Sequence, residues 1–162
     1  MVDSGKEMAK TIPGTNKKKM DLLKSQIKNS LKELKKDVPQ GISYHVMFKT
    51  YGAILGKYTK LVPIEKVETE LFPAIDEVIP GSVGLLSEDF KIVQEQLSKE
   101  TAGNVLNQIF LITGSKDNFD YSAIRQAQEI FESDVQGQVH VMDYGVKDRK
   151  TRGYMQNIAD VA

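Results

Sequence analysis

An apolar run at Ile109-Phe110-Leu111-Ile112 shows no alternation of apolar and polar positions. Such a run is typical of a strand that is covered on both faces, as in a parallel sheet between two layers of helices. The run stops at Thr113, Gly114 and Ser115. Open α/β sheets place their ligand sites at the carboxyl ends of their strands, so any site is expected at this edge.

The rest of the pattern predicts strands and helices in alternation. Apolar positions at helical spacing follow a helix start at Thr15 or Asn16 and end near Asp37, before Pro39 and Gly41. The remaining predicted elements are a strand ending at 1–2, strands at 43–49 and 58–63, helices at 64–79 (restarted by Pro73), 87–99 and 121–133, strands at 109–112 and 138–143, and a last helix from 147. The connection at 51–56 is short, which favours an antiparallel pair of strands on either side of it.

This order predicts one α/β domain over residues 1–162, a Rossmann-like three-layer sandwich. Its central sheet is expected to be mostly parallel, with one antiparallel edge strand. The chain opens on what reads as the end of a strand and stops after a helix. We therefore expect the domain to be truncated at both ends, lacking the start of the first strand and the last strand and helix.

Composition narrows the function classes. The 22 Lys and Arg residues balance 22 Asp and Glu residues, and this zero net charge argues against nucleic-acid binding. No cysteine is present, which excludes a disulfide scaffold, cysteine zinc sites and thiol catalysis. No apolar stretch approaches the roughly 18 residues of a transmembrane helix.

Motifs of enzymes are missing or incomplete. No strand is followed by G-x-G-x-x-G, and no nucleophile elbow G-x-S-x-G occurs. Gly81-Ser82-Val83-Gly84 lacks the Gly-Lys-Ser/Thr of a phosphate-binding P-loop. Asp3 and Asp117 suggest a receiver-like phospho-acceptor site, but Asp3 has no second acidic residue beside it. We expect no enzyme, and a phosphate-binding or receiver-like domain stays as one alternative.

Three loops resemble those of the von Willebrand factor A family. Val2-Asp3-Ser4-Gly5-Lys6-Glu7-Met8 lies where that family has strand-Asp-x-Ser-x-Ser-Met. Residues 80–85 lie at its threonine loop, and residues 110–115 at its strand ending in Thr-Asp-Gly. The resemblance covers essentially the whole chain and extends to A-type domains of bacterial envelope proteins. It implies a protein-binding fold, and a periplasmic or envelope location.

In that family the three loops form a metal-ion-dependent adhesion site for Mg²⁺. Only Asp3 matches it here, because Gly5 and Glu7 replace the two serines and Gly114 replaces the third-loop aspartate. Val83 stands at the threonine, or Ser82 if the loop slips by one residue. We therefore expect a degenerate site without a metal or cofactor. The alternative is metal-dependent adhesion through a rearranged site that binds Mg²⁺ or another divalent cation.

The expected function is a non-catalytic, metal-independent module for protein binding or scaffolding, and the resemblance to envelope proteins suggests that it is part of a larger bacterial envelope protein. The rearranged metal site would use Asp3, Glu7 and Ser82. The expected binding surface spans residues 3–8, 81–84 and 113–117, with Asp3, Ser4, Gly5, Glu7, Ser82, Val83, Thr113, Gly114, Ser115 and Asp117 as its candidate residues. Separately, Lys24, Lys28 and Lys32 share one helix face, which suggests contact with an anionic surface or, alternatively, a solvated outer face.

Overall fold

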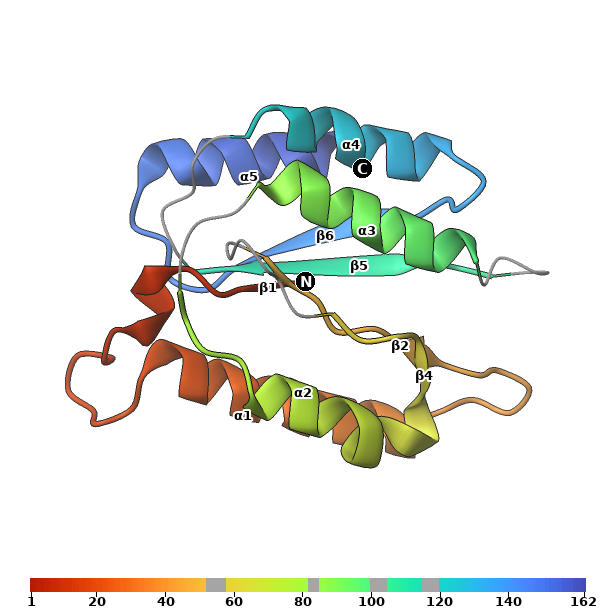
Figure 1. Cartoon of the computed structure of the whole chain (residues 1–162), viewed down its shortest axis with the longest axis horizontal. Helices are drawn as coiled ribbons and strands as arrows, with labels where there is room; N and C mark the ends of the chain where they lie inside the picture. The colour runs from red at the N-terminus through yellow and green to blue at the C-terminus, as the bar shows by residue number, and fades with distance from the viewer. Residues whose placement is uncertain (52–57, 82–84, 100–104, 115–119) are drawn as a thin grey trace.

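Every strand pair described in the central sheet is parallel. The computed structural model describes residues 1–51, 58–81, 85–99, 105–114 and 120–162. Four strands, β1 (Val2–Asp3), β3 (Thr50–Tyr51), β5 (Gln108–Thr113) and β6 (Gln138–Asp143), lie in the order β3-β1-β5-β6 (Figure 1). The predicted α/β class and the parallel sheet are confirmed.

Helices form a layer on each face of the sheet (Figure 1). One layer holds α3 (Leu86–Ser98), α4 (Ser122–Glu132) and α5 (Arg149–Val161). The other holds α1 (Lys19–Lys36) and α2 (Phe72–Asp76), with the short helical segments η1 (Lys6–Ala9), η2 (Ile64–Lys66) and η3 (Val67–Leu71). Pro73 lies in the first turn of α2, as predicted.

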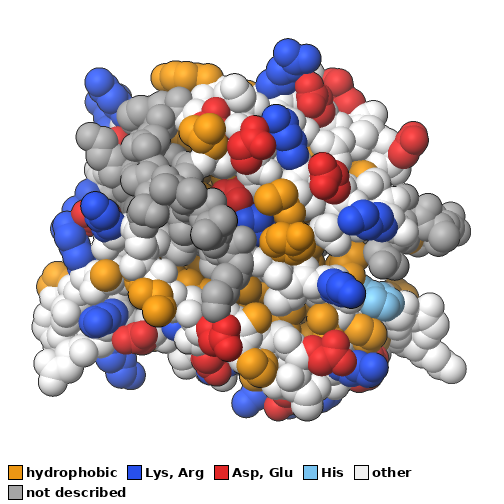
Figure 2. All heavy atoms as spheres, viewed as in Figure 1, with side chains coloured by type: hydrophobic (Ala, Val, Ile, Leu, Met, Phe, Trp, Pro, Cys, Tyr) orange, Lys and Arg blue, Asp and Glu red, His pale blue; other side chains and the backbone are white. Residues whose placement is uncertain are grey.

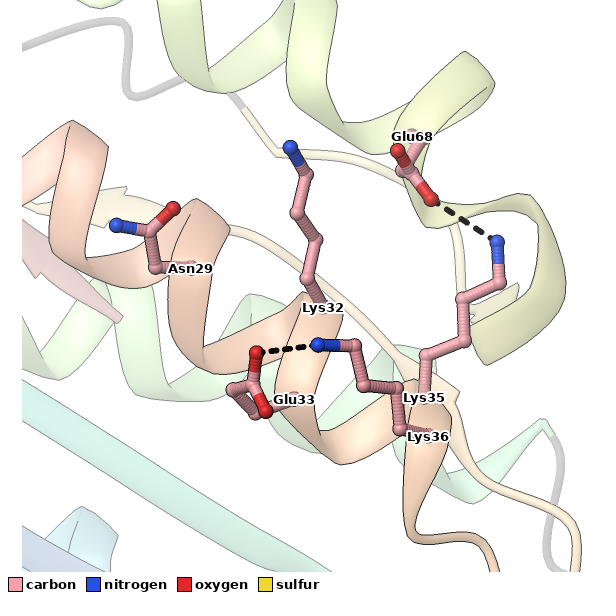
Figure 3. A pocket seen from close by; sticks show the side chains of 6 residues that line it. All are labelled: Asn29, Lys32, Glu33, Lys35, Lys36 and Glu68. Atoms are coloured by element: carbon pink, nitrogen blue, oxygen red, sulfur yellow. Dashed lines mark hydrogen bonds and ion pairs between the residues drawn. The ribbon is translucent and has the colours of Figure 1, made fainter.

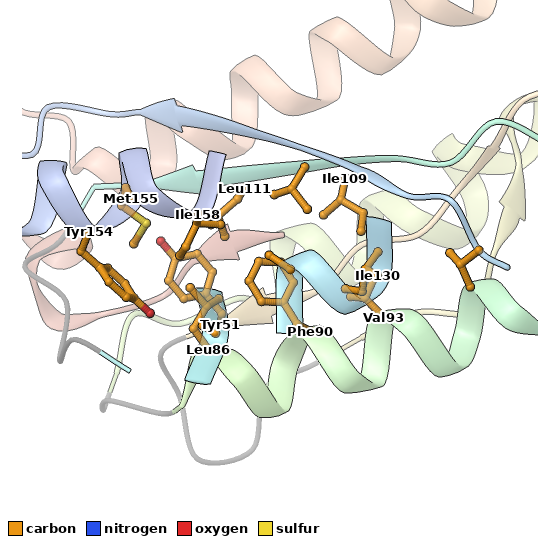
Figure 4. Close-up of a cluster of buried hydrophobic side chains, with 14 residues drawn as sticks. Tyr51, Leu86, Phe90, Val93, Ile109, Leu111, Ile130, Tyr154, Met155 and Ile158 are labelled. Carbon is orange, nitrogen blue, oxygen red and sulfur yellow. The ribbon is translucent and has the colours of Figure 1, made fainter. Parts of the chain in front are cut away.

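Each layer has its own apolar core. Figure 4 shows the core beneath α3, α4 and α5, where Ile109 and Leu111 of β5 meet Phe90, Ile130 and Ile158. The second core joins the other face of β1 to α1 and η3. Its buried members are Val2, Met8, Met20, Leu23, Phe48, Val62, Ile64, Val67, Leu71, Ile75 and Val78. Two burial surfaces fix the sheet between the layers and hold its carboxyl edge in place.

The predicted antiparallel pair is present as a separate two-stranded sheet. β2 (His45–Val46) pairs with β4 (Val62–Pro63), and an isolated bridge joins Lys49 to Tyr58. The prediction that Tyr51 belongs to the connection between these strands is wrong. Tyr51 lies in β3 and is buried in the first core. The rest of that connection, residues 52–56, lies outside the described residues.

The prediction that both faces of β5 are covered is also wrong. Ile109 and Leu111 are buried, but Phe110 is 48% exposed. Phe110 stacks on His140 of β6 at 5.1 Å between ring centroids, next to the exposed Met142. Among the described residues, no helix covers this part of the sheet. An apolar run without alternation therefore did not imply two covered faces.

The start of α1 differs from the prediction by a few residues. Thr15 does not cap the helix. Its hydroxyl donates to the carbonyl of Ile12 at 3.0 Å and accepts from the amide of Lys17 at 3.2 Å, which closes a turn. The helix begins at Lys19, whose amide donates to the carbonyl of Lys10 at 3.0 Å. Local side-chain hydrogen bonds of this kind compete with helix capping.

A buried ion pair ties β3 to α3. Lys49 precedes β3, and its ammonium donates to a carboxylate oxygen of Asp89 and to the carbonyl of Thr50 at 2.7 Å. The two charged side chains are only 2% and 9% exposed. This pair lies within the protein interior, where removal of one partner of an ion pair is strongly destabilising.

Candidate functional site

The loops that follow β1 and β5 meet at the carboxyl edge of the sheet. The amide of Gly81 donates to the carbonyl of Ser4 at 2.7 Å, and Gly5 forms a parallel bridge with Gly81. The amide of Gly114 contacts Asp3. The structure thus brings together the described parts of the three predicted loops. Of the candidate residues, Ser82, Val83, Ser115 and Asp117 lie outside the described residues.

Asp3 joins the first loop to the third. Its carboxylate accepts from the amide of Gly5 at 2.7 Å through one oxygen and from the amide of Gly114 at 2.9 Å through the other. The side chain is buried. Neighbouring Ser4 is buried too, and its hydroxyl donates to the carbonyl of Tyr51 at 2.8 Å. Both side chains therefore hold the loops in place through backbone groups.

Gly114 has little room for a side chain. A Cβ there would lie 2.5 Å from Sδ of the fully buried Met8 and 3.3 Å from the carbonyl oxygen of Tyr144. This is the position at which the resemblance places an aspartate. A carboxylate at this position would require Met8 to move within the core.

Basic side chains accompany the acidic ones at this edge. Glu7 forms an ion pair with Lys10 at 2.7 Å. The ammonium of the half-buried Lys19 lies 3.4 Å from the carbonyl oxygen of Gly114. Among the described residues, no group of three or more His, Cys, Asp or Glu side chains is arranged to hold a metal ion. Sequence reasoning missed Lys19, which carries no motif signal, and it did not foresee that Met8, at the last position of the first-loop motif, would pack against Gly114.

Thr113 is buried at the end of β5, and its hydroxyl has no hydrogen-bond partner among the described residues. It lies next to Gly114, at the centre of the expected surface. Buried hydroxyl groups usually have a hydrogen-bond partner, so the Thr113 hydroxyl is a buried polar group that could still accept or donate a hydrogen bond beneath this edge of the sheet.

Three exposed apolar side chains surround the same edge. Ile79 is 82% exposed, Leu85 56% and Tyr121 69%. Leu85 and Tyr121 stand just before α3 and α4, and Tyr121 packs edge-on against Tyr154 with 6.0 Å between centroids. Sequence analysis did not identify them, since single apolar residues beside turns are common. Together they offer contact area on a rigid frame.

The lysines on the face of α1 contact the neighbouring helix α2. Lys24 donates to the carbonyl of Asp76 at 2.8 Å, and Lys28 pairs with the Asp76 carboxylate at 2.6 Å. The ammonium groups of Lys28 and Lys32 lie 5.9 and 5.7 Å from the ring centroid of Phe72. The predicted solvated face is therefore partly a packing surface.

A depression of about 480 Å³ lies between the end of α1 and η3 (Figure 3). It is lined by Asn29, Lys32, Glu33, Lys35, Lys36 and Glu68. Lys35 pairs with Glu68 at 3.0 Å and Lys36 with Glu33 at 2.8 Å. The hydrogen bond and charge of Lys35 lower the pKa of Glu68. Paired charges of both signs make this a poor site for a charged ligand.

The described helices include none with the length and apolar character needed to cross a membrane.

Comparison with known proteins agrees on the fold. We found no matching protein-family model and no matching curated protein. A solved structure, the VWA domain of SpRpn10, matches with a TM-score of 0.71 and 16% sequence identity, over 99% of this chain and 78% of the other. The chain therefore has the fold of a von Willebrand factor A domain.

Proposed function

We propose that this chain is a non-catalytic protein-binding or scaffolding module that binds its partner at the carboxyl edge of the sheet without a metal ion. The fold is one that often mediates protein interactions. The observation that carries the proposal is the environment of Asp3, the one metal-ligand position that matches the family. Both of its carboxylate oxygens accept backbone amides, so the residue serves to join two loops.

Metal-independent binding must then come from shape, apolar area and hydrogen bonds. The exposed side chains of Ile79, Leu85 and Tyr121 supply apolar area around the edge. The backbone beneath them is held by the hydrogen bonds of Asp3 and Ser4. Aromatic and apolar anchors on a preorganised frame are the usual source of affinity in protein interfaces.

Thermal unfolding tests the metal-independent part. The wild type and Asp3→Asn are each melted with and without Mg²⁺, Mn²⁺ or Ca²⁺. A ligand that binds only the folded state, at a hundredfold excess over its Kd, adds about 2.7 kcal/mol to the free energy of unfolding. We expect no metal-dependent rise in Tm. A rise in the wild type that disappears in Asp3→Asn would return metal-dependent adhesion as the function.

Partner capture tests the surface itself. Wild type, the double variant Ile79→Ser/Tyr121→Ser and the control Leu106→Ser are immobilised and compared for the proteins they retain, in EDTA and in Mg²⁺. Leu106 is a suitable control because it is an exposed apolar residue before β5, at the opposite end of that strand. We expect EDTA-insensitive partners that are lost only from the double variant. Phosphoryl-donor labelling of the protein should be absent, and labelling would favour the receiver-like alternative.

A further inference from the structure

Basic residues are concentrated in two connections of the chain. Residues 6–19, between β1 and α1, and residues 143–152, between β6 and α5, together carry nine Lys and Arg residues and three acidic ones. We call these cations the basic end: Lys6, Lys10, Lys17, Lys18, Lys19, Lys147, Arg149, Lys150 and Arg152. Because the whole chain has no net charge, the rest of the protein is acidic on balance. The charge distribution is therefore strongly asymmetric.

The two connections are neighbours in space. The ammonium of Lys19 lies 3.4 Å from the carbonyl oxygen of Gly114, and a Cβ on Gly145 would lie 3.9 Å from that same ammonium. An antiparallel bridge between Thr11 and Lys18 folds the first connection onto itself. Figure 1 shows both connections at the same end of the sheet, and Figure 2 shows Lys and Arg side chains along that side of the molecule.

The acidic residues of these connections already have partners. Glu7 pairs with Lys10, and Asp143 lies 3.4 Å from Nε of Arg152 and accepts from the amide of Val146. Asp148 caps α5 by accepting from the amide of Thr151 at 2.8 Å. Six exposed cations have no carboxylate partner among the described residues: Lys6, Lys17, Lys18, Lys147, Arg149 and Lys150.

Some of these cations occupy positions that are unfavourable for the stability of the fold. Arg149, Lys150 and Arg152 lie in the first turn of α5, which has no acidic residue within it. Cations are disfavoured at a helix N-terminus, because the unpaired amides there carry partial positive charge. The Asp148 cap offsets only part of this repulsion. Arg149 and Lys150 therefore remain at the surface, where the carboxylates of a ligand can pair with them.

We propose that the basic end binds an acidic segment of a protein partner, with carboxylates pairing with Lys19 and the cations around it. This proposal rests on the protein-binding function proposed above and names the chemistry of the partner. A nucleic acid fits less well, because the only aromatic residue of the two connections, Tyr144, is partly buried and donates its hydroxyl to Gln26, leaving no stacking platform. A membrane surface fits less well too, since neither connection exposes a large apolar side chain for insertion.

Binding of a short fluorescent poly-glutamate peptide, measured by anisotropy, tests the proposal. The double variant Lys18→Glu/Lys147→Glu is compared with Lys60→Glu/Lys99→Glu, which makes the same change in net charge on exposed lysines of other segments. We expect saturable, salt-sensitive binding that the first variant weakens about tenfold or more, equivalent to about 1.4 kcal/mol, and that the second leaves nearly unchanged. Lys19→Met should also weaken binding, with a circular dichroism spectrum like that of the wild type.

Three results would overturn the proposal: no binding to the wild type, equal weakening by both double variants, or tighter binding to phosphatidylserine vesicles or to a single-stranded oligonucleotide. The variant Ile79→Ser/Tyr121→Ser should keep its affinity for poly-glutamate. The experiments therefore distinguish failure of the proposal for the basic end from failure of the proposed partner binding through Ile79 and Tyr121.

Discussion

Replacement of Lys49 by Met should destabilise the fold strongly. Met keeps most of the apolar stem that packs in the interior and removes only the ammonium, so the change isolates the charge. Asp89 would then remain with its carboxylate 9% exposed and without this cation. Removing one partner of a buried pair costs about 3–5 kcal/mol. A domain of this size has a total free energy of unfolding of about 5–15 kcal/mol, so the loss would be a large share of it.

The free-energy cost given for a buried pair applies to Lys49 and Asp89, because water screens this pair very little. Exposed pairs contribute far less. Lys91 and Glu88 provide the matched control, since their side chains are 53% and 61% exposed at an N–O distance of 2.9 Å. Lys91→Met should leave the urea midpoint within experimental error.

Urea denaturation followed by circular dichroism measures the effect. The double variant Lys49→Met/Asp89→Leu should regain most of the stability lost by Lys49→Met, because a buried pair replaced by apolar side chains is often neutral or stabilising. The reasoning would be refuted if Lys49→Met lost less than about 1 kcal/mol, the range of a surface pair. It would also be refuted if the losses of Lys49→Met and of Asp89→Leu, each measured alone, simply added in the double variant.

Three further predictions concern the loops and the sheet. Asp3→Ala should lower the free energy of unfolding by about 3 kcal/mol or more in urea titrations, because two buried amides lose a charged acceptor; a loss below about 1 kcal/mol would contradict this role. Gly137→Ala should lower the free energy of unfolding by about 1–3 kcal/mol, since its Cβ would lie 2.7 Å from Cγ2 of the buried Ile130. Gly153→Ala in α5 is the control: its Cβ meets nothing within 4 Å, and the change should raise the free energy of unfolding by about 0.5–1 kcal/mol. Burial raises the pKa of Tyr144 above 10.0, so the folded state holds this proton more tightly and its contribution to stability is lost as the pH rises from the unfolded pKa through the folded one. Tyr144→Phe should therefore reduce the loss of Tm above pH 10.0, and an unchanged pH profile would contradict the assignment.

Much of the fold could be predicted from the sequence because its helices carry regular apolar stripes. The helices predicted at 87–99 and 121–133 are present as α3 and α4, and Pro73 opens α2. The failures have a common physical cause. A run such as 109–112 looks the same whether or not a helix covers its second face, and Tyr51 is in a strand because it packs under α3. Tertiary packing decided both cases.

The candidate site was harder to predict than the fold. The pattern of loop residues placed Asp3 and Gly114 correctly at one edge, and the loss of the metal ligands could be read by comparison with the family motif. The side chains that lie near Gly114 could not be predicted from the sequence. Met8 is distant from it in the sequence, and Lys19 precedes it by 95 positions. Contacts of this kind depend on the assembled sheet. The same is true of the basic end, which joins two connections that are far apart in the chain.

The outer edge of β6 has a consequence for how the isolated domain behaves in solution. Among the described residues β6 pairs only with β5, so its other row of amides and carbonyls has no strand partner, and Phe110 and Met142 lie exposed on the face beside it. An open strand edge next to apolar surface is a template on which another chain can add. The concentration at which the protein stays monodisperse is therefore expected to depend on β6, on a different part of the sheet from the loops that bind.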